Sequence, residues 1–256
     1  MIQIKNLSFQ YYKGSKKVLD GLSFEIQPGT VNVLLGLNGC GKTTLIKTMA
    51  GLIVPNLGEI LYDGVSLKKI SIKDRSKVFS YVAQKSMNSD DFYVKDYLTY
   101  GFVNSLKFYE SPKPEQLESV KMISQKLKIE HLLDKKMGQL SGGEKQIVTI
   151  AVAIIQDTPI IILDEPTSAL DLRNQNLVLT VLGEIAKEGK TIILSSHNPN
   201  HALFLNANVL LMNNGKIVKY GSSSEIINKE MLKDIYGESL CFSEELPYKE
   251  ISFKAE

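Results

Sequence analysis

The segment 36–43, which reads GLNGCGKT, constrains the fold of this chain more than any other part of the sequence. It matches the pattern G-x-x-x-x-G-K-[ST], in which glycines let the backbone curl until successive N–H groups point at phosphate oxygens. Lys42 can reach the outer phosphates of a nucleotide, and the Thr43 hydroxyl can bind Mg²⁺. The expected phosphate-binding residues are Gly36, Asn38, Gly39, Cys40, Gly41, Lys42, Thr43 and Thr44.

The residues around this loop predict a parallel sheet. Residues 31–35 are almost wholly apolar, as in a strand that is buried on both faces, and residues 42–50 predict a helix that begins at the loop. Apolar strand patterns return at residues 160–163 and 191–194, with a helical stretch between them. That order is a β-α-β unit, so the chain is an α/β protein.

Other segments predict antiparallel strands. Apolar and polar residues alternate near residues 2–4 and 22–26, and residues 58–84 resemble a series of short strands. Residues 209–218 predict a hairpin whose turn contains Asn213, Asn214 and Gly215. The chain is therefore expected to combine antiparallel pieces with its parallel core.

Residues 86–158 have a different character. They carry amphipathic helical patterns at 116–127 and 147–155, and we expect them to form a helical subdomain inserted in the core. The main domain is expected to span residues 1–237, which leaves a tail at 238–256 whose pattern is hard to interpret.

Two carboxylates follow an apolar strand pattern. Asp164 and Glu165 come directly after residues 160–163, so they lie at the carboxyl edge of the predicted parallel sheet, where such folds bind their ligands. Asp164 suits a Mg²⁺ site. Glu165 faces elsewhere and can polarise an attacking water as a general base. In a chain with a phosphate loop, this pair predicts phosphoryl chemistry.

Composition narrows the classes of protein to consider. The chain has 256 residues with 43% hydrophobic residues, enough for a sizeable core, and a net charge of +2. Its Lys and Arg residues are scattered, whereas a nucleic-acid binder more often has a basic stripe, so no nucleic-acid partner is expected. Two widely separated cysteines favour a reducing compartment. No apolar run reaches the ~18 residues that span a bilayer, and no signal peptide is evident.

The pentapeptide at residues 140–144, LSGGE, resembles the signature of the ABC ATPases. Ser141, Gly142 and Gly143 open a predicted helix and offer a hydroxyl, free N–H groups and a dipole end to an anion. Ser141 is also a good helix N-cap. Further elements of that family occur once each and in the family's order: the adenine-stacking aromatic Tyr11 (with Tyr12 as fallback), the Q-loop Gln84, the D-loop Asp171 and the switch His197.

The resemblance implies a P-loop NTPase (RecA-like) core with an N-terminal antiparallel β-subdomain and a helical signature subdomain. It implies catalytic roles for Glu165, His197, Gln84 and Lys42, and Mg²⁺ contacts for Thr43, Gln84 and Asp164. In this family, ATP is held between the phosphate loop of one copy and the signature of a second copy, here with Asp171 at the interface. The implied partners are a second copy, transmembrane permease subunits and, indirectly, a substrate-binding protein, with the chain at the cytoplasmic face of the cell membrane.

Three positions depart from the family pattern. Cys40 replaces a serine or alanine, and Ile147 and Val152 stand where the helix after the signature usually carries arginines. A small residue at position 40 is compatible with the loop. Because Cys40 lies beside Lys42 at a helix N-terminus, one hypothesis is a thiolate that ATP protects from alkylation; a merely tolerated small residue is the alternative.

The segment 197–202, HNPNHA, resembles the ATPases of iron-siderophore, haem and cobalamin importers. The alternatives are an exporter ATPase with a separate membrane chain and a soluble ABC ATPase that is not part of a transporter. We expect His201 to be a solvated helix residue and not a metal ligand. Aromatic residues of the helical subdomain are candidates for a permease-docking groove or for subdomain core: Phe92, Tyr93, Tyr97 and Tyr100.

Overall fold

A computed structural model describes residues 1–84, 90–106, 110–237, 240–243 and 250–253. Within these residues no helix is long and apolar enough to cross a membrane.

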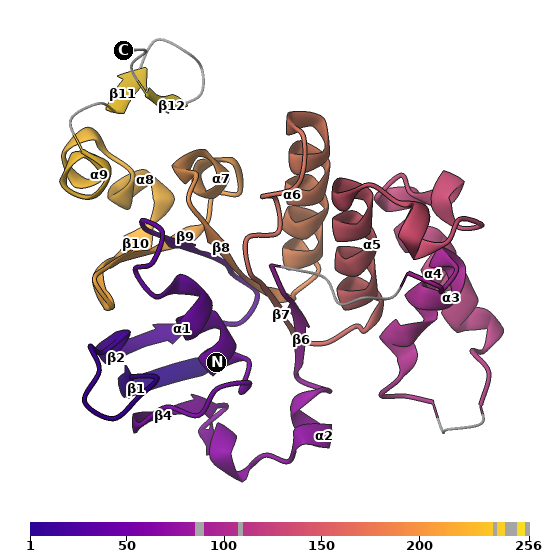
Figure 1. The fold of residues 1–256 in the computed structure, drawn as a ribbon, viewed down its shortest axis with the longest axis horizontal. Helices are drawn as coiled ribbons and strands as arrows, with labels where there is room; N and C mark the ends of the chain where they lie inside the picture. The colour runs from indigo at the N-terminus through magenta and orange to yellow at the C-terminus, as the bar shows by residue number, and fades with distance from the viewer. Residues whose placement is uncertain (85–89, 107–109, 238–239, 244–249, 254–256) are drawn as a thin grey trace.

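The centre of the protein is a six-stranded sheet with the order β10-β9-β3-β8-β7-β6 (Figure 1). The strands β3 (Val31–Leu35), β6 (Phe79–Val82), β7 (Ile160–Leu163), β8 (Thr191–Ser196) and β9 (Asn208–Asn213) run parallel to one another. Only β10 (Lys216–Ser222) is antiparallel, and it forms a hairpin with β9. The predicted β-α-β core and the predicted hairpin are both confirmed.

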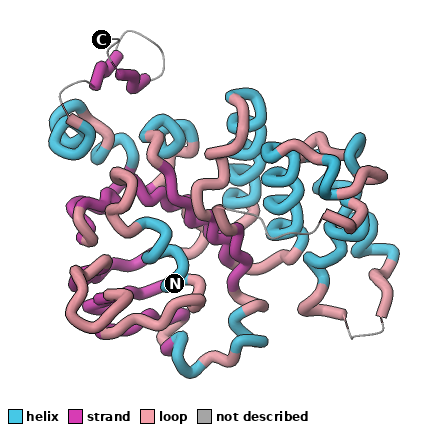
Figure 2. Tube along the Cα trace, viewed as in Figure 1, coloured by secondary structure: helices cyan, strands magenta, loops and turns pink. Residues whose placement is uncertain are grey.

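Apolar side chains on both faces of these strands explain why the sheet is buried. Val33 and Leu35 of β3 point into one hydrophobic cluster, with helices α5 (Gly142–Ile155), α6 (Leu172–Lys187) and α7 (Pro199–Phe204). Leu34 points into a second cluster, which it shares with helix α1 (Lys42–Met49). Figure 2 shows the strands as a continuous band with helices around it. The functional groups at the strand ends are therefore carried by a framework with apolar packing on both sides.

A smaller antiparallel sheet covers the α1 side of the core and has the order β2-β1-β4-β5. In β1 (Ile2–Phe9) and β2 (Leu19–Ile26), Ile2 lies opposite Ile26 and Ile4 lies opposite Phe24, as the alternating pattern predicted. The strands β4 (Leu57–Tyr62) and β5 (Val65–Ser66) complete this sheet. Helix α2 (Ile72–Arg75) and the 3-10 helix η1 (Leu67–Lys69) occupy the charged part of the stretch 58–84, for which the sequence predicted short strands and no helix.

Helices occupy the chain between β6 and β7 and lie to one side of the main sheet (Figure 1). They are α3 (Val94–Leu98), the 3-10 helix η2 (Thr99–Phe102), α4 (Pro114–Lys126), the 3-10 helices η3 (Glu130–Leu132) and η4 (Met137–Gln139), and α5. Leu140 and Ile147 belong to the same hydrophobic cluster as Val33 and Leu35. The helical part is thus packed directly against one face of the central sheet.

The C-terminal part contains helices α8 (Ser223–Ile226) and α9 (Lys229–Tyr236). A short hairpin of β11 (Leu240–Ser243) and β12 (Glu250–Phe253) follows them. The sequence did not predict this hairpin.

Candidate nucleotide site

The phosphate loop connects β3 to α1, as its position in the sequence predicted. Gly41 caps the helix with φ of 110°, and a Cβ at this position would lie 2.8 Å from the carbonyl oxygen of Val18. Glycine is therefore needed both for the backbone angle and for the close approach. The first turn of α1, with Lys42, Thr43 and Thr44, lines a cavity at this edge of the sheet.

The Lys42 side chain is folded back along the loop. Its ammonium group donates to the carbonyl oxygens of Gly36 at 2.8 Å and Leu37 at 3.1 Å, and the residue is 5% exposed. Among the described residues, this buried ammonium donates to neutral carbonyls, and it can exchange them for a phosphate, because an ionised acceptor makes a stronger hydrogen bond.

Asp164 directly follows β7 and contacts the phosphate loop through Thr43. Its Oδ1 accepts from the Thr43 hydroxyl at 3.1 Å and from the Ser195 hydroxyl at 2.8 Å. Its Oδ2 is buried and has no hydrogen-bond partner among the described residues. Burial, and then the charge of Asp164, raise the pKa of Tyr81 to about 12. An unpartnered buried carboxylate oxygen beside a threonine hydroxyl is a suitable donor set for Mg²⁺, which prefers oxygen ligands.

Glu165 lies one residue further and joins a second group of side chains. Its backbone has φ of 48°, which turns the side chain away from Asp164, and its N–H donates to the Ser195 hydroxyl at 2.9 Å. Its Oε2 accepts from the Gln84 amide at 3.1 Å and lies 3.9 Å from Nδ1 of His197. Gln84 and His197, which are far apart in sequence, therefore converge on one carboxylate oxygen of Glu165.

A cavity of about 490 Å³ opens at this edge of the sheet. Tyr11 closes one side; it is 57% exposed, its hydroxyl lies 3.1 Å from that of Thr44, and its ring packs edge-on against Phe9. An exposed ring above a phosphate loop is available for stacking on a base. The lining residues are Tyr11, Val18, Asn38, Gly39, Gly41, Lys42, Thr43, Thr44, Gln84 and Glu165.

The signature segment lies outside this cavity, since none of the described lining residues comes from it. Ser141 is the N-cap of α5, where it forms a reciprocal capping box with Glu144, and its contacts lower the pKa of the Glu144 carboxyl. Gly143 approaches the D-loop so closely that a Cβ there would lie 3.1 Å from the carbonyl oxygen of Ala169. The signature and the D-loop therefore form one surface.

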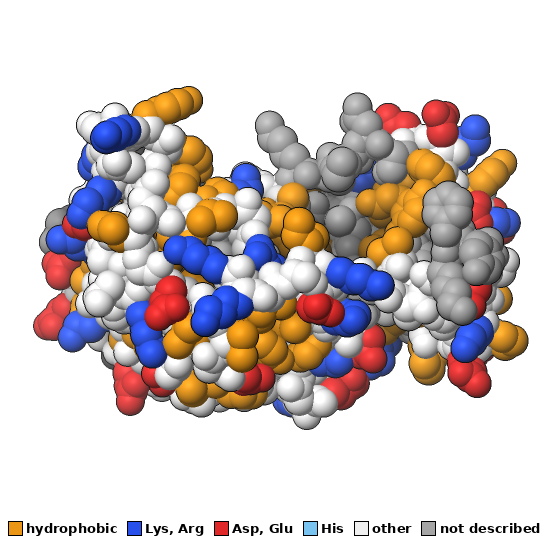
Figure 3. Space-filling view, turned by 90° about the horizontal axis from the view of Figure 1, so that it is seen from below, with side chains coloured by type: hydrophobic (Ala, Val, Ile, Leu, Met, Phe, Trp, Pro, Cys, Tyr) orange, Lys and Arg blue, Asp and Glu red, His pale blue; other side chains and the backbone are white. Residues whose placement is uncertain are grey.

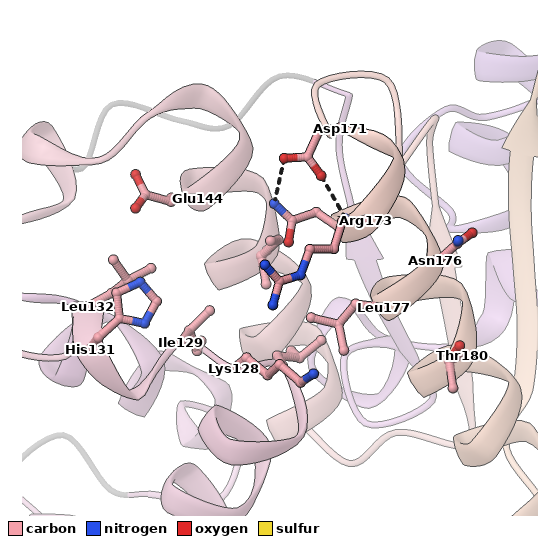
Figure 4. Close-up of a pocket in the computed structure, with 13 residues that line it drawn as sticks. Lys128, Ile129, His131, Leu132, Glu144, Asp171, Arg173, Asn176, Leu177 and Thr180 are labelled. Carbon is pink, nitrogen blue, oxygen red and sulfur yellow. Dashed lines mark hydrogen bonds between the residues drawn. The ribbon is translucent and has the colours of Figure 1, made fainter.

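A separate cavity of about 470 Å³ borders that surface (Figure 4). Asp171 caps α6 through Asn174, and Arg173 points into the cavity toward Lys128. Glu144 lines the opposite side. The structure thus brings the phosphate loop, Asp164, Glu165, Gln84, His197 and Tyr11 together at one edge, and Ser141, Gly142, Gly143 and Asp171 at another.

The hypothesis of a reactive Cys40 is wrong. Cys40 is buried in the hydrophobic cluster that contains α1. Burial raises the pKa of the thiol, and this effect exceeds the opposing effect of the Lys42 charge. Because a low-dielectric surrounding disfavours the charged form, the thiol stays protonated near neutral pH.

The expectation that His201 is solvated is also wrong. The residue is 7% exposed, and its Nδ1 lies 2.9 Å from the Ser196 hydroxyl. Ser195 is a further residue that the sequence did not single out, although its hydroxyl contacts both Asp164 and Glu165. The available signal was a pair of serines that directly continues an apolar strand pattern.

Comparisons with known proteins agree with this geometry. A family model described as ABC transporter matches residues 19–168. The petrobactin import ATP-binding protein YclP of Bacillus subtilis is 35% identical over 240 residues, which cover 92% of this chain and 92% of that protein. The ferric enterobactin transport ATP-binding protein FepC of Escherichia coli is 32% identical over 225 residues, which cover 88% of this chain and 83% of FepC.

A similar solved structure is a transporter in an inward-facing conformation that is assigned to the metal-chelate type. Its TM-score is 0.82 at 27% identity, and the match covers 99% of this chain and 97% of that chain.

Proposed function

The chain belongs to the ABC transporter family as an ATP-hydrolysing subunit of the importer type, and from that premise we propose that two copies bind Mg·ATP head to tail and drive uptake of a metal chelate. The observation that carries this proposal is the convergence of Thr43, Asp164, Gln84, Glu165 and His197 at the phosphate loop. Phosphoryl transfer depends mainly on such positioning and on charge stabilisation.

A few side chains have separate roles in binding Mg·ATP. Lys42 leaves its loop carbonyls and binds the β- and γ-phosphates, while Tyr11 stacks on adenine. Thr43 and Asp164 would hold Mg²⁺, which neutralises part of the phosphate charge when it is bound. The unpartnered Oδ2 of Asp164 supports this assignment.

The hydrolytic step is assigned to Glu165. Its carboxylate takes a proton from the attacking water as general base. Gln84 and His197 lie against the same Oε2, so they orient this carboxylate before ATP arrives. We assign the exposed His197 to the outer phosphate of the bound nucleotide, to which it would donate a hydrogen bond.

A second copy completes the site. Ser141 and the N-terminus of α5 offer a hydroxyl and free N–H groups to an anion, yet they do not line the cavity beside their own phosphate loop. We assign them to the γ-phosphate of the partner's ATP, with Asp171 at the interface. Loss of the γ-phosphate then loosens the dimer, and a membrane partner can use this motion.

The permease is expected to dock on the helical part. Phe92, Tyr93, Tyr100 and Val103 are exposed there, and the ring of Tyr100 contacts those of Phe92 and Tyr97. Tyr97 itself packs against the core, so it serves the subdomain interior. Figure 3 shows one face of the molecule, on which apolar side chains are exposed among acidic and basic groups at both ends. The exposed and mutually contacting rings of Phe92 and Tyr100 support docking to a membrane protein at the cytoplasmic face.

The transported substrate is assigned by similarity. Relatives named for petrobactin import and ferric enterobactin transport support an iron-siderophore chelate, delivered to the permease by a substrate-binding protein. Uptake of radiolabelled iron-siderophore by cells that lack this chain and by complemented cells tests this part. Equal uptake in the two strains would contradict it.

The dimer and the hydrolytic role are tested with Glu165→Gln. This variant keeps the hydrogen-bonding shape and removes the base, so we expect normal Mg·ATP affinity, turnover reduced at least about a hundredfold, and a stable dimer. Light scattering after gel filtration with Mg·ATP measures the dimer, and the native chain with Mg·ADP is the control. Normal turnover would remove Glu165 from its role. If the variant binds ATP but stays strictly monomeric, the proposal of a head-to-tail dimer is contradicted.

A further inference from the structure

The turn that carries His197 is held by a buried hydrogen-bond network. The turn connects the end of β8 at Ser196 with the start of α7 at Pro199 (Figure 1). The Ser196 hydroxyl accepts from the N–H of Asn198 at 2.9 Å and lies 2.9 Å from Nδ1 of His201. The side-chain amide of Asn198 lies 3.4 Å from Nε2 of His201. One buried imidazole therefore contacts the turn on both sides of His197.

The partners of His201 define which nitrogen carries the proton. A neutral imidazole has one donor and one acceptor. The Asn198 amide nitrogen can only donate, so Nε2 of His201 accepts and Nδ1–H donates to the Ser196 hydroxyl. Ser196 then donates its own proton to the carbonyl oxygen of Asn198 at 3.3 Å. Every polar group of the network is satisfied in this arrangement, and no other tautomer achieves that.

The surroundings of His201 keep it in this form. Burial lowers the pKa of its imidazole to about 4, and the nearby His197 acts in the same direction. The ring is therefore neutral under physiological conditions. It cannot exchange protons with the reaction, so its contribution is geometric.

We propose that His201 is a positioning residue for His197, which it holds over the catalytic carboxylate by fixing Ser196 and Asn198 on either side. This inference rests on the proposed role of His197 in ATP hydrolysis. His197 itself is exposed, and its Nδ1 lies 3.9 Å from Oε2 of Glu165. An exposed side chain on a short turn has little packing of its own, so its direction follows from the backbone that carries it.

Substitutions at His201 in the full-length chain separate the roles of its two nitrogens. His201→Leu removes both hydrogen bonds, and we expect kcat for ATP to fall about tenfold with an unchanged KM, since the loss is felt in the reaction geometry and not in nucleotide binding. His201→Asn places an amide N–H near the position of Nδ1. It should therefore restore kcat to within about threefold of the native value.

A packing control lies on the same helix. Leu203 of α7 is partly buried against the hydrophobic core and takes no part in the network. Leu203→Ala should lower Tm at least as much as His201→Leu while leaving kcat unchanged. If Leu203→Ala reduces kcat as strongly as His201→Leu, the effect is general loosening of α7 and the proposal is overturned.

A double variant tests whether His201 acts through His197. In single-turnover hydrolysis, adding His201→Leu to His197→Ala should cause no further loss, because the group that it positions is already gone. A second tenfold loss in that background would overturn this inference and leave the role of His197 intact. Native turnover by His197→Ala alone would overturn both.

Discussion

Ser195 offers a direct measure of how the strand ends hold the site together. Its hydroxyl is fully buried, donates to Oδ1 of Asp164 at 2.8 Å and accepts from the N–H of Glu165 at 2.9 Å. Ser195→Ala removes a hydrogen bond to a charged group, worth about 1.5–3 kcal/mol, and leaves the part-buried N–H of Glu165 unpaired at a cost of up to about 1–3 kcal/mol. Because one hydroxyl makes both contacts, the losses overlap, and we expect the free energy of unfolding to fall by about 3 kcal/mol.

This loss is large enough to measure by two methods. In a chain of this size, about 3 kcal/mol corresponds to a fall in Tm of about 6–12 °C. Urea unfolding followed by circular dichroism should show a lower midpoint at an unchanged slope. We also expect weaker Mg²⁺-dependent stimulation of turnover, since Asp164 loses a partner that fixes its carboxylate.

Ser80 is a matched control for this experiment. It lies on β6 in the same sheet and is 1% exposed, but its hydroxyl has no hydrogen-bond partner among the described residues. Ser80→Ala therefore removes a buried hydroxyl without breaking a bond, and the free energy of unfolding should change by less than about 0.5 kcal/mol. If the two alanine variants lose equal stability, the contacts of Ser195 contribute nothing beyond burial, and the reasoning fails.

Two further predictions concern the phosphate loop. Lys42→Ala should weaken binding of a fluorescent ATP analogue at least about tenfold, since a charge-assisted contact to phosphate is lost, and unchanged affinity would contradict the loop assignment. With Cys241→Ser as background, iodoacetamide should alkylate Cys40 more slowly near neutral pH in the folded chain than in urea, because burial raises the thiol pKa and thiolate appears only at more alkaline pH. Equal rates in the two states would contradict the buried-thiol description.

The strands that the sequence predicted best are those with uniformly apolar residues. The bounds of β3 and β7 agree with the predicted segments. The apolar run of β8 ends at Leu194, and the strand continues through Ser195 and Ser196, which are both buried. Their hydroxyls are satisfied by tertiary partners, and a pattern along one segment does not reveal such partners.

Helix α5 begins where the signature segment predicted, although the residues of its first turn have poor helix propensity. The apolar periodicity covers only residues 147–155, but the prediction that Ser141, Gly142 and Gly143 open a helix is confirmed, since Ser141 is the N-cap and α5 begins at Gly142. Two glycines disfavour helix by propensity, but the capping box between Ser141 and Glu144 compensates for them at the first turn.

The sequence predicted those site residues whose positions follow from strand order, and it did less well for residues whose positions depend on tertiary packing. The meeting of Thr43 and Asp164 follows from strand order and the carboxyl edge of a parallel sheet. Gln84, His197 and Tyr11 came from resemblance. His201 was misjudged because a single histidine on a short helix has no periodicity, so its burial depends on how α7 packs against the core.

The separation of the signature from its own phosphate loop follows from the same core that positions the loop. Leu140 and Ile147, next to the signature, belong to the hydrophobic cluster on the α5-facing side of β3. Helix α1 and Cys40 of the phosphate loop belong to the cluster on the opposite side of the sheet. Bringing Ser141 to its own nucleotide would require breaking the first cluster, at a cost of several kcal/mol for each large apolar side chain exposed. Opening and closing a contact between two intact copies has no such cost. The packing of the sheet therefore favours a site that is completed in trans.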